Sequence, residues 1–139
     1  MLRFLFDTDH LTLYYHRHAQ LMHRMAVQPP DAVGVSAVTA EETLRGRLAA
    51  LSQARDGPRR IVRYRLLLES LDLLSQFLLV PHDQASENHF QQLRSLRLKV
   101  GTQDLKIAAI VLANNLVLLT RNRCDFGRIA GLRIDDWSM

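Results

Sequence analysis

The stretch "GTQDLKIAAIVLANNLVLLTRNRCDF", residues 101–126, joins a helical pattern to a short apolar strand and a polar loop. Gly101 precedes a helix that we predict over Thr102–Asn115, and Leu116–Leu119 has the apolar, β-prone composition of a buried strand. Asp104 lies in the first turn of that helix, and Asn122 and Asp125 follow the strand. The stretch therefore predicts an α/β unit with acidic and amide side chains beside the carboxyl end of its strand.

The rest of the chain alternates between strand and helix patterns in the same way. The further predicted strands are Leu2–Phe6, Ala32–Ser36, Leu78–Val80 and Leu132–Ile134, and the further predicted helices are Thr8–Val27, Val38–Arg55, Arg59–Phe77 and Asp83–Leu98. Such alternation predicts a parallel sheet that is covered by helices on both faces. Ligands bind such sheets at the carboxyl ends of the strands.

Length and composition predict one soluble domain over residues 1–139. Hydrophobic residues make up 47% of the chain, and no stretch has the features of a signal peptide or the length of a membrane span. The only cysteine, Cys124, suits a reducing compartment, so we expect a cytoplasmic protein without a membrane. The net charge of +4 comes almost entirely from arginine, which favours phosphate and nucleic acid as partners.

Acidic residues follow or flank the predicted strands at four separate places in the sequence. Asp7 and Asp9 follow the first strand, and Glu41 and Glu42 begin the helix after the second. Asp104 and Asp125 flank the strand at Leu116–Leu119. Because clustered carboxylates repel one another, they require a compensating cation, and hard oxygen ligands suit Mg²⁺ or Mn²⁺.

Each of these residues also has an ordinary structural interpretation. Asp7 or Thr8 is a candidate helix cap, and Thr39 with Glu42 matches a capping box. Asp104 would favour a helix N-terminus through the dipole, while Asn122 and Asp125 are common turn residues. The residues alone leave the metal site and these structural roles open.

Four segments together resemble the PIN-domain ribonucleases, and most of all the VapC-type toxins of bacterial toxin–antitoxin pairs. These segments are "FLFDTDHL", "SAVTAEETLRG", "GTQDLKIAAIVLANNLVLLTRNRCDFGRI" and "GLRIDDW". The likeness is weakest between about Leu51 and Arg97. It implies a PIN-like three-layer α/β/α sandwich around a mostly parallel sheet.

The resemblance also implies a set of functional residues. The metal-facing and catalytic acids fall on Asp7, Glu42, Asp104 and Asp125, with supporting roles for Thr120, Asn122 and Asp9. Glu42 fits the motif better than Glu41, and Asn122 is the alternative to Asp125 as the fourth group. Arg45, Arg121 and Arg123 are the candidates for binding substrate phosphates.

By this resemblance the chain is a Mg²⁺- or Mn²⁺-dependent endoribonuclease in which a water activated by the ions attacks an RNA phosphodiester. The family implies a homodimer and a cognate antitoxin whose tail blocks the site, for which the leucine-rich helix Arg59–Phe77 is a candidate surface. A PIN fold that binds RNA or protein without cutting is the alternative function.

Two phosphoryl-transfer families also begin with a strand followed by an Asp pair. A haloacid-dehalogenase-type phosphatase would use Asp7 as nucleophile, and Thr120 with Asp135-Asp136 imitates its later motifs. That chemistry requires a Lys between the Thr and the paired acids, as a response-regulator receiver requires a late Lys, and no Lys follows Lys106. Both families are excluded.

Overall fold

The computed structural model describes all residues 1–139 and contains one five-stranded sheet in the order β3-β2-β1-β4-β5. The strands are β1 (Phe4–Phe6), β2 (Val33–Ser36), β3 (Leu78–Val80), β4 (Val117–Leu119) and β5 (Arg133–Asp135). Every neighbouring pair is parallel; in the centre, Phe4 pairs with Val33 on one side and with Val117 on the other. The predicted α/β fold is confirmed, and the sheet is wholly parallel.

Seven helices connect and cover these strands. They are α1 (Thr8–Tyr15), α2 (Ala19–Ala26), α3 (Ala37–Ser52), α4 (Gly57–Ser75), α5 (Gln84–Ser95), α6 (Thr102–Ala113) and α7 (Arg123–Phe126). The prediction of one helix over Thr8–Val27 is wrong, because Arg17 adopts a left-handed φ of 54° and divides the segment into α1 and α2. The short α7 was not predicted.

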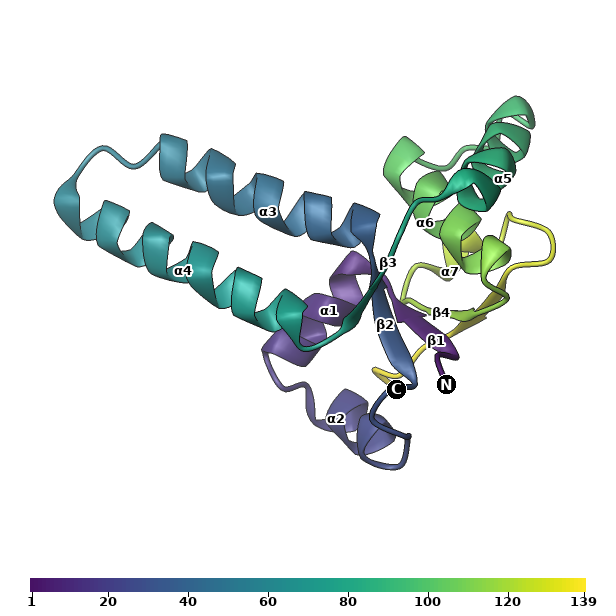
Figure 1. Cartoon of the computed structure of the whole chain (residues 1–139), viewed down its shortest axis with the longest axis horizontal. Coiled ribbons are helices and arrows are strands. Elements are labelled where there is room, and N and C mark those ends of the chain that lie inside the picture. Colours follow the sequence, from purple (N-terminus) through teal and green to yellow (C-terminus); the bar gives the residue numbers. More distant parts are fainter.

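The sheet separates two hydrophobic layers. Helices lie on both of its faces (Figure 1). On one face, Leu5 and Leu118 pack with α5 and the apolar side of α6. On the other face, Phe6 and Val35 pack with residues of α1, α2 and α4. Side chains alternate along each strand, so a three-residue strand such as β1 contributes to both layers.

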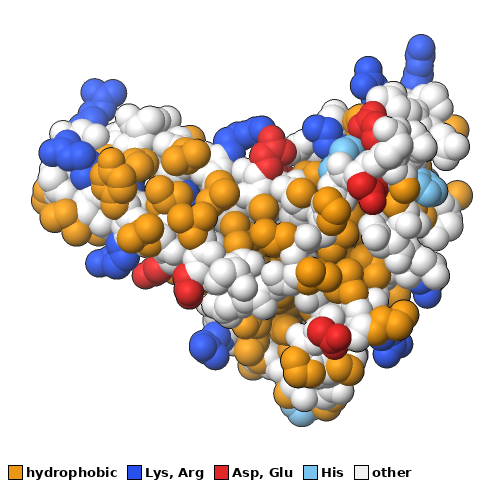
Figure 2. Space-filling model, viewed as in Figure 1, with side chains coloured by type: hydrophobic (Ala, Val, Ile, Leu, Met, Phe, Trp, Pro, Cys, Tyr) orange, Lys and Arg blue, Asp and Glu red, His pale blue; other side chains and the backbone are white.

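Helices α3 and α4 form a long antiparallel hairpin that extends from one side of the sheet (Figure 1). Side chains exposed on α4 include Ile61, Tyr64, Leu68 and Leu71, which recur every three or four residues and therefore share one face. Figure 2 shows hydrophobic side chains gathered over this hairpin and the adjoining sheet edge. The edge is β3, where Leu78 and Leu79 are also exposed.

The direction in which the strands are added reverses between β1 and β4. The chain passes from β1 outward to β2 and β3, and then returns to the opposite side of β1 with β4 and β5. In parallel sheets this point creates a crevice at the carboxyl ends of the strands. Asp7 follows β1 and Thr120 follows β4, so both lie at the reversal.

No helix of the chain combines the length and the apolar composition needed to cross a membrane.

Candidate metal-binding site

Asp7 is fixed in position by both the sheet and the first helix. Its backbone N–H donates to the carbonyl of Leu119, which ties it to β4. Its side chain caps α1, because Oδ1 accepts the backbone N–H of His10 at 2.7 Å. With 6% of its surface exposed, Asp7 is a buried carboxylate whose second oxygen, Oδ2, is not used by the cap.

Glu42 lies in the second turn of α3 and is oriented by Thr8. The Thr8 hydroxyl donates to Oε1 of Glu42 at 2.8 Å and lies 3.1 Å from the hydroxyl of Thr39. The capping-box interpretation of Thr39 and Glu42 is wrong: Ser36 caps α3 by accepting the N–H of Thr39. Glu42 is therefore directed to the Asp7–Thr8 segment rather than back to its own helix.

The neighbouring Glu41 has a different environment. It is exposed, pairs with Arg45 one turn later and accepts a hydrogen bond from Gln103 at 3.0 Å. The Gln103 hydrogen bond and the charge of Arg45 hold the pKa of Glu41 below its ordinary value. Glu41 is thus stabilised as a charged surface residue.

Asp104 lies close enough to the other three predicted acids to feel their charges. Its pKa is raised first by burial and then by the negative charges of its three acidic neighbours, which are Glu42, Asp7 and Asp125. Asp104 lies in the first turn of α6, whose cap is Gly101 and lacks a side-chain hydrogen bond. The four acids lie at or near the beginnings of four different helices, α1, α3, α6 and α7. They are far apart in the sequence, and folding of the chain brings them near Asp104.

Asn122 holds Asp125, the fourth predicted acid, in place through hydrogen bonds. Asn122 caps α7: its Oδ1 accepts the backbone N–H of Asp125, and its Nδ2 donates to Oδ2 of Asp125 at 3.1 Å. The buried Thr120 hydroxyl accepts the backbone N–H of Asn122 at 2.9 Å. Both polar atoms of the Asn122 side chain are thus engaged by Asp125. Of these two residues, Asp125 is the one whose charge acts on Asp104.

Asp9 and the three predicted phosphate-binding arginines lie around the rim of the cluster. Arg121 donates to both oxygens of Asp9, so neither side chain is free in this structure. Arg45 is paired with Glu41, whereas Arg123 is exposed and has no side-chain hydrogen bond. Of the three arginines, Arg123 is the one free to bind a phosphate as it stands.

Asp7, Asp9 and His10 are the one group in the chain whose ligand atoms all lie within 4.8 Å of one another. Asp9 is paired with Arg121 and the His10 ring is fully buried, so Asp7 is the member of this trio whose charge acts on Asp104. No sequence motif predicted a role for His10; its position three residues after Asp7, in the first turn of α1, was the available signal.

The donor set of the four acids fits a divalent cation. Carboxylate oxygens are the ligands that Mg²⁺ and Mn²⁺ prefer, and carboxylates without a cation between them repel one another. Burial first, and then this repulsion, raise the pKa of Asp104. The cluster does not resemble a zinc site, because none of the four residues is Cys or His.

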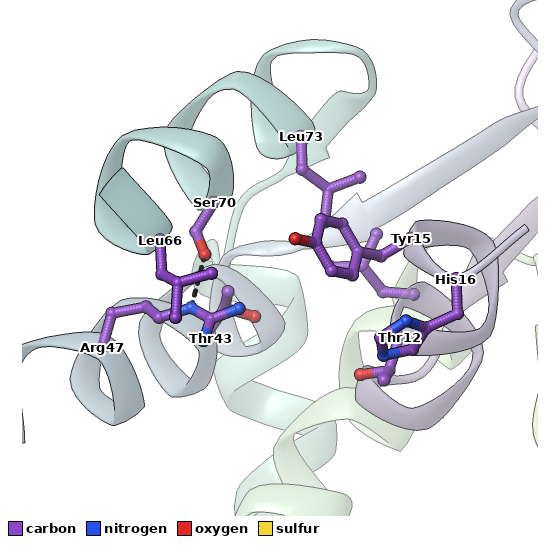
Figure 3. A pocket seen from close by; sticks show the side chains of 9 residues that line it. Thr12, Tyr15, His16, Thr43, Arg47, Leu66, Ser70 and Leu73 are labelled. Atoms are coloured by element: carbon purple, nitrogen blue, oxygen red, sulfur yellow. Dashed lines mark hydrogen bonds between the residues drawn. The ribbon is translucent and has the colours of Figure 1, made fainter. Parts of the chain in front are cut away.

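A groove lies between α1, α3 and α4 (Figure 3). Its volume is about 340 Å³, and apolar Leu66 and Leu73 line it beside polar Thr12 and Thr43. Arg47 lies in its wall and donates to Ser70 at 2.8 Å. A second cavity shares Thr12, Thr43 and Arg47 with this groove and is also lined by Thr8, the partner of Glu42.

Comparison with known structures finds the same fold along the whole chain. The DNA-bound VapBC complex of Salmonella typhimurium contains a chain that is 24% identical, with a TM-score of 0.82 and coverage of 99% of both chains. VapBC-1 of nontypeable Haemophilus influenzae is 21% identical, with a TM-score of 0.78 and coverage of 100% of both chains. DNA-bound VapBC2 of Rickettsia felis is 20% identical, with a TM-score of 0.77 and coverage of 98% and 99%.

A search of curated protein sequences finds no match. The family model described as "PIN domain" matches residues 13–132, which is most of the chain. Together with the parallel sheet, this match shows that the chain belongs to the PIN-domain family.

Proposed function

We propose that the chain is a VapC-type toxin, a single PIN domain over residues 1–139 that cleaves RNA phosphodiesters with Mg²⁺ or Mn²⁺. The observation that carries the proposal is that Glu42, Asp7 and Asp125 all lie close enough to Asp104 for their charges to add to the effect of burial and raise its pKa. The fold shared with chains of VapBC complexes supports the same assignment.

We assign Asp7, Glu42, Asp104 and Asp125 as the metal ligands. When bound, the ion would supply positive charge to polarise the phosphodiester and activate water. Thr8 and Asn122 orient Glu42 and Asp125 through hydrogen bonds, and Thr120 fixes the loop that carries Asn122. Arg123 would contact a flanking phosphate directly, while Arg121 and Arg45 would do so only after leaving Asp9 and Glu41.

The decisive experiment measures cleavage of total cellular RNA by the wild-type chain and by Asp104→Asn, each with Mg²⁺, Mn²⁺ or EDTA. Asp72→Asn is the matched control, because Asp72 is an exposed Asp on α4 away from the cluster. We expect metal-dependent cleavage by the wild type and the control, and at least a hundredfold slower cleavage by Asp104→Asn. Retained RNA binding without any cleavage by the wild type would instead support the alternative, a PIN module that binds RNA or protein.

We further propose that a cognate antitoxin binds the groove between α1, α3 and α4. This groove combines apolar Leu66 and Leu73 with residues that it shares with the cavity at Thr8, the partner of Glu42. An amphipathic segment laid in it would bury these leucines and reach the acids, which would block the site. Solved structures with the same fold include a toxin–antitoxin complex and a member of the VapBC family of toxin–antitoxin systems, which supports such a partner.

The exposed face of α4 is the surface that we propose for a homodimer. Ile61, Tyr64, Leu68 and Leu71 lie on the side of α4 opposite Leu66 and Leu73, because helical spacing separates the two sets. Dimerisation through this face would leave the groove accessible to an antitoxin. Exposed apolar surface of this extent on a soluble chain favours protein contact over solvent.

A further inference from the structure

His10 lies between the proposed metal site and the segment Asp135–Ser138. Its ring is fully buried and packs against Phe6, with 6.0 Å between the ring centroids. Nδ1 lies 3.5 Å from Oδ1 of Asp7, and Nε2 lies 3.6 Å from Oδ1 of Asp136. A buried imidazole between two carboxylates has few ways to satisfy both nitrogens.

The backbone of Trp137 determines which ring nitrogen carries the proton. The Trp137 N–H donates to Nε2 of His10 at 3.2 Å. Because a backbone amide can only donate, Nε2 presents its lone pair, and the ring proton lies on Nδ1. Nδ1 is buried and has no hydrogen-bond partner, although Oδ1 of Asp7 lies 3.5 Å from it.

The ring contacts an Asp7 oxygen that already accepts a hydrogen bond. Oδ1 of Asp7 accepts the backbone N–H of His10 at 2.7 Å, and Nδ1 of the ring lies 3.5 Å from the same oxygen. One hydrogen bond fixes the position of Oδ1 but leaves the carboxylate plane free to turn about it. The buried ring packed beside Oδ1 restricts that rotation, and Oδ2 remains the oxygen available to a cation.

We propose that His10 is a positioning residue that orients Asp7 through the contact of its Nδ1 side with Oδ1 and couples this orientation to the backbone of Trp137. The proposal rests on the proposed function, because it assumes that Asp7 is a metal ligand. Groups that orient metal ligands typically change metal affinity or activity by about 10–100-fold. The proposal thereby gives the segment after β5, which provides none of the four acids, a role in metal binding.

The Trp137 side chain keeps this segment in place. It is 2% exposed and lies 4.8 Å from Phe4 and 6.5 Å from Phe6, measured between ring centroids. Its indole N–H donates to Oδ2 of Asp135, and Asp136 accepts the backbone and hydroxyl of Ser138. One nitrogen of the His10 ring thus accepts the backbone N–H of Trp137, and the other contacts Oδ1 of Asp7.

Two amide variants separate the two ring nitrogens. His10→Asn places an amide nitrogen near the position of Nδ1, whereas His10→Gln places an amide oxygen near Nε2 and leaves the position of Nδ1 beside Asp7 empty. His23→Gln is the matched control, because His23 is exposed on α2. Each full-length chain is tested for Mn²⁺ affinity by calorimetry and for Tm in EDTA, and long-range ¹H–¹⁵N spectra of the wild type report the His10 tautomer.

We expect the wild-type spectrum to show the Nδ1–H tautomer in the absence of metal. We expect about tenfold weaker Mn²⁺ binding in His10→Gln, and binding within about threefold of wild type in His10→Asn. An Nε2–H tautomer, or equal Mn²⁺ affinity in His10→Gln and wild type, would overturn the proposal. So would weakening of Mn²⁺ binding that only follows the loss of Tm in both variants.

The two proposals fail differently. If the wild type binds no Mn²⁺ and cleaves no RNA, the proposed function fails and the positioning role fails with it. If the wild type binds Mn²⁺ and His10→Gln binds it equally well, only the positioning role is lost. The tautomer is measured without metal, so it tests the geometry in either case.

Discussion

Arg121 and Asp9 form a two-pronged ion pair, with Nε and Nη2 of Arg121 donating to the two Asp9 oxygens at 2.7 and 2.8 Å. The pair joins the loop after β4 to the first turn of α1, across the edge of the sheet where the four acids meet. The charge and hydrogen bonds of Asp9 raise the pKa of Arg121 further above its ordinary value. The Asp9 carboxylate thus occupies the two guanidinium N–H groups of Arg121 that a substrate phosphate would otherwise contact.

Asp9→Asn is expected to release Arg121 and strengthen RNA binding. Measured in EDTA, affinity for a short RNA should rise several-fold and fall more steeply with salt, because one more phosphate is contacted. Stability should change by less than about 1 kcal/mol, since both partners are half exposed. In the Arg121→Gln background the same substitution should give little gain; an equal gain there would show that the loss of negative charge alone is responsible.

Asp104→Asn is expected to stabilise the metal-free chain at pH 7. The pKa of Asp104 is raised in the folded state, so the folded chain binds more protons than the unfolded chain between the ordinary value of 3.8 and the raised value. The contribution of Asp104 to the free energy of unfolding therefore falls as the pH rises through that interval. The side chain of Asp104→Asn does not titrate, so the variant does not lose this stability. Thermal unfolding in EDTA should show a Tm gain of a few degrees at pH 7 and a smaller gain at pH 4. A lower Tm at pH 7 would contradict this account of the cluster.

Thr8→Val is expected to weaken metal binding while leaving the fold intact. It removes the hydroxyl that donates to Glu42 at 2.8 Å and keeps the shape of the side chain. We expect Mn²⁺ affinity and RNA cleavage to fall about tenfold, and Thr8→Ser to restore both. Calorimetry and initial cleavage rates measure the two effects, and identical behaviour of the Val and Ser variants would exclude a role for the hydroxyl.

Asn122→Ala is expected to loosen Asp125 and to cost about 1 kcal/mol of stability, because α7 loses its cap. Mn²⁺ affinity should fall as well, since Asn122 contacts both the backbone and the carboxylate of Asp125. Asn122→Ser keeps a cap oxygen but lacks the amide donor, so it should recover stability more than metal affinity. Chemical denaturation and calorimetry on the three chains separate these contributions.

Leu68→Glu is expected to disrupt the proposed homodimer. Leu68 is 65% exposed in the middle of the apolar face of α4, so a charge there would oppose burial at an interface. Sedimentation velocity should show a dimer for the wild type and a monomer for the variant. Val27→Glu, at an exposed position beyond α2, serves as the control and should remain dimeric. A wild-type monomer at all micromolar concentrations would reject this surface as a dimer interface.

The strands were predicted well from the sequence because each is a short, mostly apolar run next to polar or turn-forming residues. The structure shortens the predicted Leu2–Phe6 to Phe4–Phe6 and shifts the predicted Leu132–Ile134 to Arg133–Asp135. The break at Arg17 was missed because it occurs at an arginine with positive φ, without the glycine that normally marks such a turn. The short α7 was missed because its polar residues are equally typical of a turn.

Side-chain partners at the site could not be read from local patterns. Thr39 and Glu42 have capping-box spacing, yet the cap is Ser36, because β2 ends at that residue and α3 begins directly after it. The pairing of Asp9 with Arg121 and the contact of Trp137 with His10 join residues that are 112 and 127 positions apart. Such contacts depend on strand order, which the sequence constrains only through the expectation of a parallel sheet.

The strand order also determines when the four acids come together during synthesis of the chain. The central strand β1 pairs with β4, so Phe4 has no partner on that side until Val117 has been made, and Asp125 emerges from the ribosome later still. Until then, a nascent chain carries Asp7, Glu42 and Asp104 without Asp125, the last of the four acids. Under the proposed cleavage of RNA, this order of assembly protects the message and the ribosome that are producing the chain, because the acids come together only after most of the chain has been translated.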